Sequence, residues 1–448
     1  MKKLILEHFR CFAEQEINFK KGINLLVGDN ATGKTSILKA SKYVLSSFFS
    51  GFSDENTKWI NPDAADFREV IANEGIILPE QPIRIRFNVD DTIEHASLLQ
   101  TQPELLQTND TECRYILTKN SKKNSRPLTS GIAQYKSYTQ SLLNDYISAN
   151  GQHRTLPLFA SFSTEDIHSS RKINKQKFKA YHQKPSFGYY ECLDGDGFFE
   201  YWIYRLLILQ EGRENHPEIT IVRNALKEAL GENGCHIIAD ISIRPIQKKV
   251  FFIFADGREI EADYLSDGYR RIINIVIDIA FRCAFLNRGI FGENTCQQTK
   301  GTVLIDEVDL HLHPTLQAKI LTGLRRAFPQ IQFIVTSHAP MVMSGVENND
   351  ENVVYKLDYS DGNYTLDEVN TYGLDISTLT DIILHQTPRV KEVDENLSHL
   401  FDLIDQDEIV AAKTLFNSLR IRFGENLPEL AQAEAMLNCI INPEDEEN

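Results

Sequence analysis

Gly28-Asp29-Asn30-Ala31-Thr32-Gly33-Lys34-Thr35 is the stretch that decides the fold. It has the GxxxxGK[ST] spacing of a phosphate-binding loop. An apolar segment (residues 22–27) precedes it and a helical one (residues 34–47) follows, which is the context that such a loop requires. Glycines let successive backbone N–H groups point at the phosphates, and the helix N-terminus adds the positive end of its dipole. The predicted ATP-binding residues of the loop are Asn30, Gly33, Lys34, Thr35 and Ser36.

The second motif is an apolar strand that ends in two adjacent carboxylates, Thr302-Val303-Leu304-Ile305-Asp306-Glu307. Side chains alternate along a strand, so the two acids need not share one role. We expect Asp306 and the Thr35 hydroxyl to hold Mg²⁺. We expect Glu307 to orient and polarise the attacking water as general base. The alternative is an ordinary strand end followed by two surface acids. It is less favoured because a phosphate loop lies upstream in the same chain.

A third motif, Thr336-Ser337-His338-Ala339-Pro340, follows the apolar segment 332–335. A histidine at a strand end is more often structural than catalytic. Here a further strand of the same sheet would end beside the nucleotide, which favours the catalytic interpretation. His338 is therefore predicted to donate to the γ-phosphate and to report whether the nucleotide is ATP or ADP.

The fourth motif, Leu265-Ser266-Asp267-Gly268-Tyr269-Arg270, opens a long apolar helix at residues 267–285. Ser266 and Gly268 at a helix N-terminus form a second anion site. One chain has one γ-phosphate to bind, and Lys34 already serves it. The second site is best explained if it reaches the nucleotide of a partner subunit. The plainer alternative is a serine N-cap with a glycine in the first turn.

The 448 residues carry a formal net charge of −16. This acidic balance excludes a protein that simply coats nucleic acid or anionic membrane. No stretch reaches the roughly 18 apolar residues of a membrane span, and Glu7 comes too early for a secretory segment. The seven cysteines form no CxxC pair, which is typical of reduced thiols. We expect a cytoplasmic protein without membrane contact.

Together the four motifs resemble those of the ABC-type ATPases of the RecF, SMC/Rad50 and OLD group over about residues 1–346. The opening Leu6-Glu7-His8-Phe9-Arg10-Cys11-Phe12 is similar to the start of that group, which implies that Arg10 approaches the nucleotide. The runs Leu304-Ile305-Asp306-Glu307-Val308-Asp309-Leu310-His311-Leu312-His313-Pro314 and Phe328-Pro329-Gln330-Ile331-Gln332-Phe333 look closest to the PtuA-like branch, the ATPase subunits of bacterial anti-phage systems such as Septu. By this resemblance Ser266 and Gly268 are signature residues that reach across a head-to-tail dimer, with Asp309 and Tyr269 at its interface.

The resemblance implies an α/β fold, the head of an ABC-type ATPase and thus a P-loop NTPase. We expect lobe I with the phosphate loop over residues 1–184 and a helical and β insertion, lobe II, over residues 185–265. The signature helix, the Walker B strand and the switch histidine would complete the head over residues 266–369. A helical region for partner docking or oligomerisation would follow over residues 370–448.

Differences from related families narrow the kind of ATPase that we expect. Transporter ATPases carry Gly-Gly-Gln where this chain has Asp267-Gly268-Tyr269, and no Q-loop glutamine follows residues 159–162. His311 and His313 resemble a metal pair, but the family pattern favours roles at an interface. No heptad arm, no TOPRIM-like set of acids and no metal loop are expected; Asp194-Gly195-Asp196-Gly197 is interpreted as a turn.

The resemblance implies ATP and Mg²⁺ as cofactors, a homodimer or higher homo-oligomer, and a separate effector protein, a nuclease. Basic residues cluster at Lys119, Lys122, Lys123 and Arg126 and again at Arg171, Lys172, Lys175, Lys177 and Lys179. These clusters leave contact with DNA or RNA open, because a charge run is usually a solvated loop.

The leading hypothesis is an ATP-hydrolysing clamp and sensor in a prokaryotic anti-phage system. The alternatives are a RecF-like DNA repair ATPase and a slow-turnover switch that acts by binding nucleotide.

Overall fold

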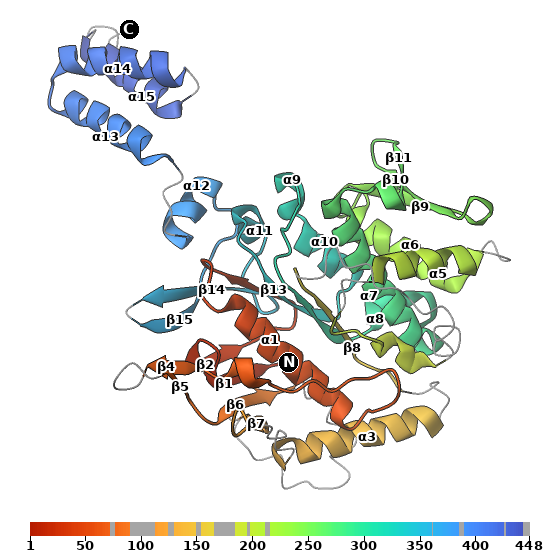
Figure 1. Cartoon of the computed structure of the whole chain (residues 1–448). Coiled ribbons are helices and arrows are strands. Elements are labelled where there is room, and N and C mark those ends of the chain that lie inside the picture. Colours follow the sequence, from red (N-terminus) through yellow and green to blue (C-terminus); the bar gives the residue numbers. More distant parts are fainter. Residues whose placement is uncertain are drawn as a thin grey trace. The chain divides into compact units, whose positions relative to one another are not determined.

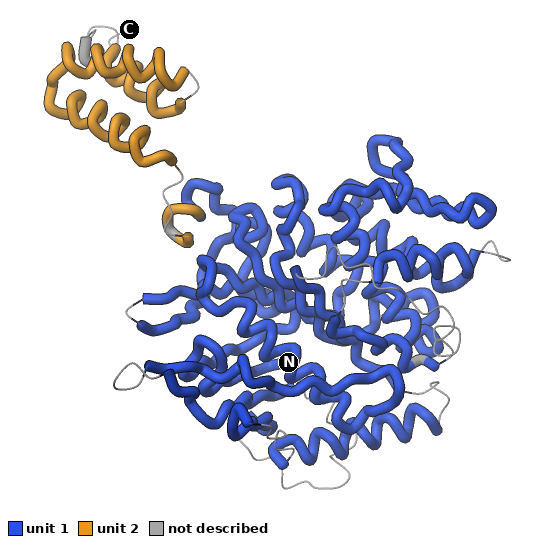
Figure 2. Tube along the Cα trace, viewed as in Figure 1, with its two compact units in different colours: residues 1–379 blue, residues 380–448 orange. Residues whose placement is uncertain are grey.

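In the computed structural model, the chain forms two compact units, Met1–Leu379 and Thr380–Asn448 (Figure 2). The described residues are 1–71, 77–89, 113–123, 130–148, 154–164, 184–194, 198–210, 216–360, 362–384, 389–424 and 427–441. The predicted basic residues Arg126, Arg171, Lys172, Lys175, Lys177 and Lys179, the turn residues Gly195, Asp196 and Gly197, and the acidic tail at 444–447 lie outside them.

The centre of the first unit is a six-stranded sheet with the order β15-β14-β3-β13-β12-β8 (Figure 1). Its strands are β3 (Ile23–Val27), β8 (Leu158–Phe162), β12 (Gly301–Ile305), β13 (Ile331–Thr336), β14 (Val353–Ser360) and β15 (Asn363–Glu368). Neighbours from β14 to β8 are parallel, and β15 is antiparallel to β14. Every residue of β3 and β13 is buried, as in a sheet that is covered on both faces. The ends of β3, β12 and β13, where three motifs begin, therefore meet at one edge.

An antiparallel sheet of order β2-β1-β6-β7 forms a second layer. Its strands are β1 (Lys3–Phe9), β2 (Phe12–Asn18), β6 (Ile83–Asn88) and β7 (Tyr115–Lys119), and β4 (Glu69–Ile71) pairs with β5 (Ile77–Pro79) in a short ribbon. Helix α1 (Lys34–Ser47) contacts β12 and β13 of the central sheet and β1 and β6 of this one. Helix α3 (Ala133–Ser148) contributes Tyr135, whose ring packs against Phe87 and Tyr115. Both sheets thus hold the helix that follows the phosphate loop.

A helical and β segment lies between β8 and the long helix α7 (Asp267–Phe291). It contains α5 (Phe199–Gln210), α6 (Pro217–Leu230) and the sheet β11-β10-β9, formed by β9 (Ile238–Arg244), β10 (Lys249–Phe254) and β11 (Glu259–Glu261). Helix α7 contacts α5, α6 and β8, so it joins this segment to the central sheet. The shorter helices are α8 (Thr295–Gln298), α9 (Pro314–Gln317), α10 (Ile320–Ala327), α11 (Pro340–Ser344) and α12 (Ile376–Thr378).

The core of the first unit contains a charged cluster on α7. Asp278 and Arg282 are at most 1% exposed and form an ion pair with a shortest distance of 2.6 Å. The Trp202 indole of α5 donates to Asp278 at 2.8 Å, and Arg282 donates to the carbonyl oxygens of Gly188 and Tyr190. Buried charges persist when they are paired and hydrogen-bonded, and this cluster meets both conditions.

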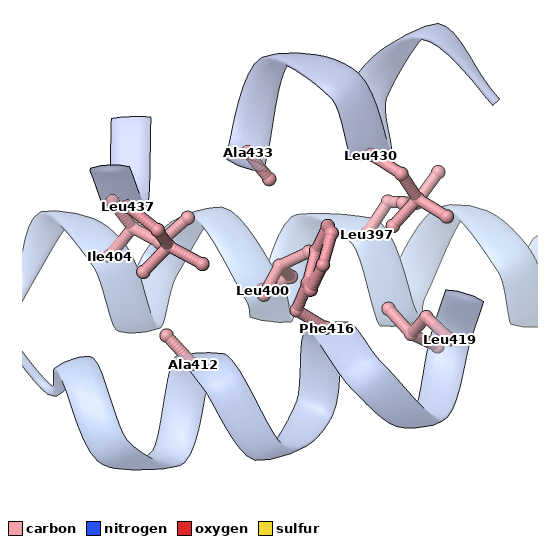
Figure 3. Close-up of a cluster of buried hydrophobic side chains, with 9 residues drawn as sticks. All are labelled: Leu397, Leu400, Ile404, Ala412, Phe416, Leu419, Leu430, Ala433 and Leu437. Atoms are coloured by element: carbon pink, nitrogen blue, oxygen red, sulfur yellow. The ribbon is translucent and has the colours of Figure 1, made fainter. Parts of the chain in front are cut away.

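The second unit packs three helices around a core of its own. They are α13 (Lys391–Asp405), α14 (Ile409–Phe423) and α15 (Pro428–Ile441). Figure 3 shows side chains from all three helices pointing into that core, among them Leu400, Phe416 and Ala433. An apolar residue recurs every three or four positions on α13 (Leu397, Leu400, Ile404), which is the spacing of one buried helix face.

The predicted ABC-type α/β fold is confirmed, with local corrections. The helix predicted for residues 267–285 continues to Phe291. Sequence reasoning did not find the hairpin β14–β15.

Candidate nucleotide site

Two glycines shape the phosphate loop, which connects buried β3 to α1. Gly28 has a φ of 143°, and a Cβ placed on it would lie 2.2 Å from the carbonyl oxygen of Leu357. Gly33 has a φ of 100°, and its Cβ would lie 2.5 Å from the ring of Phe12. A side chain at either position is excluded by both the backbone angle and the space. The loop is therefore closed in by β14 and by the β1–β2 turn.

Lys34 lies inside this loop. Its ammonium donates to the carbonyl oxygens of Gly28 at 2.8 Å and Asp29 at 2.6 Å. Burial lowers the pKa of Lys34 to about 8, while the charges of Asp29, Asp306, Glu307 and Asp309 act in the opposite direction. One ammonium is thus held near carboxylates from two separate segments, at the point where the sequence predicts the terminal phosphates.

The proposed magnesium ligands face each other. The Thr35 hydroxyl lies 3.4 Å from Oδ2 of Asp306. The other carboxylate oxygen, Oδ1, accepts from the Thr336 hydroxyl at 2.6 Å, and the Thr336 hydroxyl in turn accepts from the Glu307 backbone N–H at 2.7 Å. A hydroxyl and a carboxylate at this separation fit Mg²⁺, which takes oxygen ligands and keeps several waters. Thr336 thus holds the Asp306 carboxylate and the Glu307 backbone, a role that the sequence alone does not reveal.

Glu307 occupies an unusual backbone position. Its φ is 48°, in the left-handed region, and its side chain is half-buried. A residue other than glycine in this region is strained, and such strain concentrates at functional sites. The turn starts directly after Asp306, so the two neighbouring carboxylates leave the chain at different angles. This geometry suits the separate roles expected for them.

The Ser337 side chain ties Asp309 to the segment that carries His338. The Ser337 hydroxyl donates to Asp309 at 2.6 Å and accepts from the backbone N–H of Ala339 at 3.0 Å. Burial and then the charge of Lys34 lower the pKa of His338 below its usual 6.5. The imidazole is therefore neutral at pH 7, with one N–H that can donate. Asp309, expected at a dimer interface, is held here by its own chain.

Of the predicted signature residues, Gly268 lies against the loop after β12. Ser266 is exposed and precedes α7 without a side-chain cap, while a Cβ on Gly268 would lie 2.2 Å from the carbonyl oxygen of His311. The Tyr269 ring packs edge-on against Phe254 of β10 at 5.1 Å. Gly268 thus has an intrachain reason to be glycine. No described contact connects Ser266 to the phosphate loop of its own chain.

Arg271, which sequence reasoning did not single out, ties α7 to the Walker B strand. This buried side chain donates to the carbonyl oxygen of Asp306 at 2.5 Å. A movement of the α7 N-terminus would therefore reach Asp306 directly. The only advance signal was an arginine one turn into the signature helix.

Arg10 lies in the β1–β2 turn at a φ of 52°. Its guanidinium pairs with buried Asp66 at 3.4 Å, and Asp66 also pairs with Lys39 at 2.7 Å. The turn itself touches the phosphate loop, since Cys11 lies 3.8 Å from the Ser36 hydroxyl. The turn that carries the predicted Arg10 thus lies beside the phosphate loop, but the Arg10 guanidinium is paired with Asp66. Asn30 is exposed at the tip of the loop.

His313 and His311, the predicted metal-like pair, have different surroundings. The His313 ring accepts from the Thr315 backbone N–H as the N-cap of α9, and His311 is exposed at a φ of 62°. Within the described ranges, no group of three His, Cys, Asp or Glu side chains is arranged to hold a metal ion. Nor does any helix of the described chain have the length and apolarity to cross a membrane.

The head of an ABC-type ATPase is defined by a parallel sheet beside an antiparallel layer. At one edge, the parallel sheet presents a phosphate loop, adjacent Asp and Glu residues, and a histidine. The chain belongs to the family described as "AAA domain, putative AbiEii toxin, Type IV TA system", whose model matches residues 23–344. This confirms the predicted ATPase of the RecF, SMC and OLD group, related to PtuA.

Curated relatives carry related names. The chain is 25% identical to the "Retron Vc95 probable ATPase" of Vibrio cholerae over 80% of its own length and 74% of that protein's. It is 24% identical to the "Septu protein PtuA" of Bacillus thuringiensis over 78% of its own length and 74% of that protein's. Among solved structures, the SMC head domain from Thermotoga maritima is 14% identical with a TM-score of 0.40, and the comparison covers 82% of this chain and 98% of that one.

Proposed function

We propose that this protein is the ATP-binding and hydrolysing sensor subunit of a prokaryotic anti-phage defence system, and that it controls a separate effector, a nuclease. The observation that carries the ATPase part is the convergence of Lys34, Asp306, Glu307 and His338 at one sheet edge. The defence part rests on the similarity to Septu PtuA and retron ATPases.

In this proposal, hydrolysis requires two chains. Lys34 and Thr35 bind the terminal phosphates and Mg²⁺, and Glu307 activates the water. Ser266, exposed at the start of α7, contacts the γ-phosphate of a second copy. Asp309 and Tyr269 lie near that junction. The Arg271 bond to the Asp306 carbonyl gives each α7 N-terminus a direct path to the metal ligand of its own chain.

The second unit is the proposed contact for the effector or for further copies. Its three helices enclose a separate core, so it can carry an interaction surface without taking part in the ATPase fold. Contact with nucleic acid has less support in the described part of the chain. Lys119 is buried and Lys122 pairs with Glu69, so this segment offers Lys123 as its exposed lysine.

The first experiment measures ATP hydrolysis against protein concentration for the wild type and for Glu307→Gln. A rate per subunit that rises with concentration would support a composite site. Loss of a general base lowers rates by about 10²- to 10⁴-fold, so Glu307→Gln should bind ATP with little turnover. A concentration-independent rate, or full activity in Glu307→Gln, contradicts the proposed site.

The second experiment tests the defence function in cells that carry the whole locus. Phage plaques should increase when Lys34 is changed to Ala, with no change in survival after DNA damage. Sensitivity to DNA damage without a change in plaque number would instead support the RecF-like repair alternative.

A further inference from the structure

The strand order of the central sheet indicates on which side of β3 the nucleoside of a bound nucleotide would lie. Strands β13 and β12, which carry the groups expected at the γ-phosphate and Mg²⁺, lie on one side of β3, and β14 and β15 lie on the other. Asp306 and Glu307 follow β12, and His338 follows β13. A triphosphate with its γ end toward these residues points its α-phosphate and nucleoside toward the β14–β15 side.

The β14–β15 hairpin runs beside the phosphate loop. Strand β14 pairs with β3 as far as Lys356 opposite Val27 and then continues to Ser360. The Leu357 carbonyl closes over Gly28, as the 2.2 Å distance to a Cβ there indicates. Strand β15 also contacts β2, and Figure 1 shows the hairpin next to the antiparallel layer. The hairpin therefore borders the space into which the nucleoside would extend.

Three aromatic rings lead outward from the loop on this side. Phe12, whose ring lies against Gly33, is 5.5 Å from the ring of Tyr364 in an edge-on arrangement. Tyr364 is in turn 4.7 Å from Tyr359, its cross-strand partner in the register. Exposure increases along the series, from 1% at Phe12 to 54% at Tyr359. The rings thus pass from the buried wall of the loop to the surface.

Cross-strand aromatic pairs stabilise a hairpin without any ligand, so a purely structural role is the alternative to consider. Two facts favour binding. The pair lies at the exposed end of the hairpin, while buried Leu357 already anchors the strand to the loop. The positions also lie on the side that the sheet order assigns to the nucleoside. Half-buried Tyr364 and exposed Tyr359 place aromatic surface there, on which a nucleobase can stack.

We propose that Tyr364, supported by Tyr359 and Phe12, is the stacking platform for the adenine ring of ATP and determines a preference for purine nucleotides. The proposal rests on ATP binding at the phosphate loop and is independent of the defence function. Stacking recognises the extent of the ring system rather than its hydrogen-bonding groups. ATP and GTP should therefore bind with similar affinity, and CTP and UTP more weakly.

The test compares two ligands that share phosphates but differ in the base. Binding of ATP and of inorganic tripolyphosphate is measured calorimetrically with Mg²⁺. Tyr364→Ala should weaken ATP binding about tenfold, within the roughly 5- to 150-fold range for stacking of one base. Its affinity for tripolyphosphate should not change. Tyr364→Trp, which keeps the stacking surface, should restore ATP binding.

Controls separate the platform from the phosphate loop. Tyr372→Ala removes an exposed tyrosine outside the hairpin and should leave both affinities unchanged. Lys34→Ala should weaken both ligands. Unchanged ATP affinity in Tyr364→Ala, or an equal loss for ATP and tripolyphosphate, would overturn the proposal, because the base would then bind elsewhere or the hairpin would act only on the loop. A wild-type protein that binds neither ligand would instead refute the nucleotide site itself.

Discussion

At the scale of single residues, sequence motifs predict the candidate reacting groups but not the residues that hold them in place. Lys34, Thr35, Asp306, Glu307 and His338 were all predicted from local patterns. Thr336 and Arg271 were not, because their roles depend on contacts between segments far apart in the chain. Thr336 orients Asp306 only because β13 pairs with β12 in register, with Val335 opposite Ile305. A motif search cannot supply that register.

Lys34 predicts a pH dependence of ATP binding. Burial lowers the pKa of Lys34 from 10.5 to about 8, so the folded protein binds this proton more weakly than the unfolded chain does. The resulting destabilisation is full below pH 8 and is relieved as pH rises from 8 to 10.5. Bound phosphates favour the ammonium form, so ATP binding above pH 8 requires proton uptake.

ATP affinity measured in EDTA should therefore fall above about pH 8, by at most about tenfold per pH unit, since one proton is linked to binding. Lys34→Met should bind weakly at every pH, without this slope. A flat profile for the wild type from pH 7 to 9.5 would mean that Lys34 stays protonated in the unliganded protein.

At the scale of secondary-structure elements, long periodic segments were predicted well and a short surface hairpin was not. Helix α7 was found because its apolar residues recur at helical spacing over a long stretch. The β14–β15 hairpin was missed because β15, Asn363–Glu368, has no buried residue and is mostly polar. Its strand conformation depends on pairing with β14. The missed element is also the one that carries the proposed nucleobase platform.

The buried ion pair of α7 should be essential for stability. Asp278→Ala would leave the buried Arg282 guanidinium with carbonyl hydrogen bonds but without its carboxylate, and removing one partner of such a pair costs about 3–5 kcal/mol. Thermal unfolding of this variant should begin several degrees lower than in the wild type. Glu200→Ala removes the partner of a largely exposed pair with Arg270 and should change stability by less than about 1 kcal/mol. Equal effects of the two substitutions would contradict the structural role of the buried pair.

Gly268 and Ser266 should have separable effects although both belong to the signature motif. A Cβ at Gly268 meets the His311 carbonyl at 2.2 Å, so Gly268→Ala must displace the α7 N-terminus, lower thermal stability and reduce hydrolysis. Ser266 is exposed and makes no cap, so Ser266→Ala should keep wild-type stability and lose only hydrolysis. Melting curves and ATPase rates of both variants test this difference. A destabilised Ser266→Ala would favour the capping role for the serine.

At the scale of the whole molecule, the proposed ATPase site has two halves, and in the structure no described contact connects Ser266 to the phosphate loop of its own chain. We propose that the phosphate loop, Asp306 and Glu307 form one half, and that the α7 N-terminus with Ser266 forms the other. A head-to-tail dimer with two-fold symmetry would pair each half with its complement and create two equivalent sites. The sequence predicts such a dimer because one chain has two anion sites but only one γ-phosphate to bind. The motifs alone do not predict how the two sites are arranged in space.

Mixing two inactive variants tests this assembly directly. Lys34→Ala disables the phosphate loop and Ser266→Ala disables the signature, so each variant alone should hydrolyse little ATP. In a mixed dimer, the intact phosphate loop of the Ser266→Ala chain meets the intact Ser266 of the Lys34→Ala chain, and one of the two sites is complete. With random exchange, half of the dimers are mixed, so activity should recover to about one quarter of the wild-type rate. Mixing Lys34→Ala with Glu307→Gln is the control: both changes lie in the same half, so neither site of a mixed dimer is complete and no recovery is expected. Absence of recovery in the first mixture, with exchange of subunits shown by a labelled chain, would mean that Ser266 acts within its own subunit.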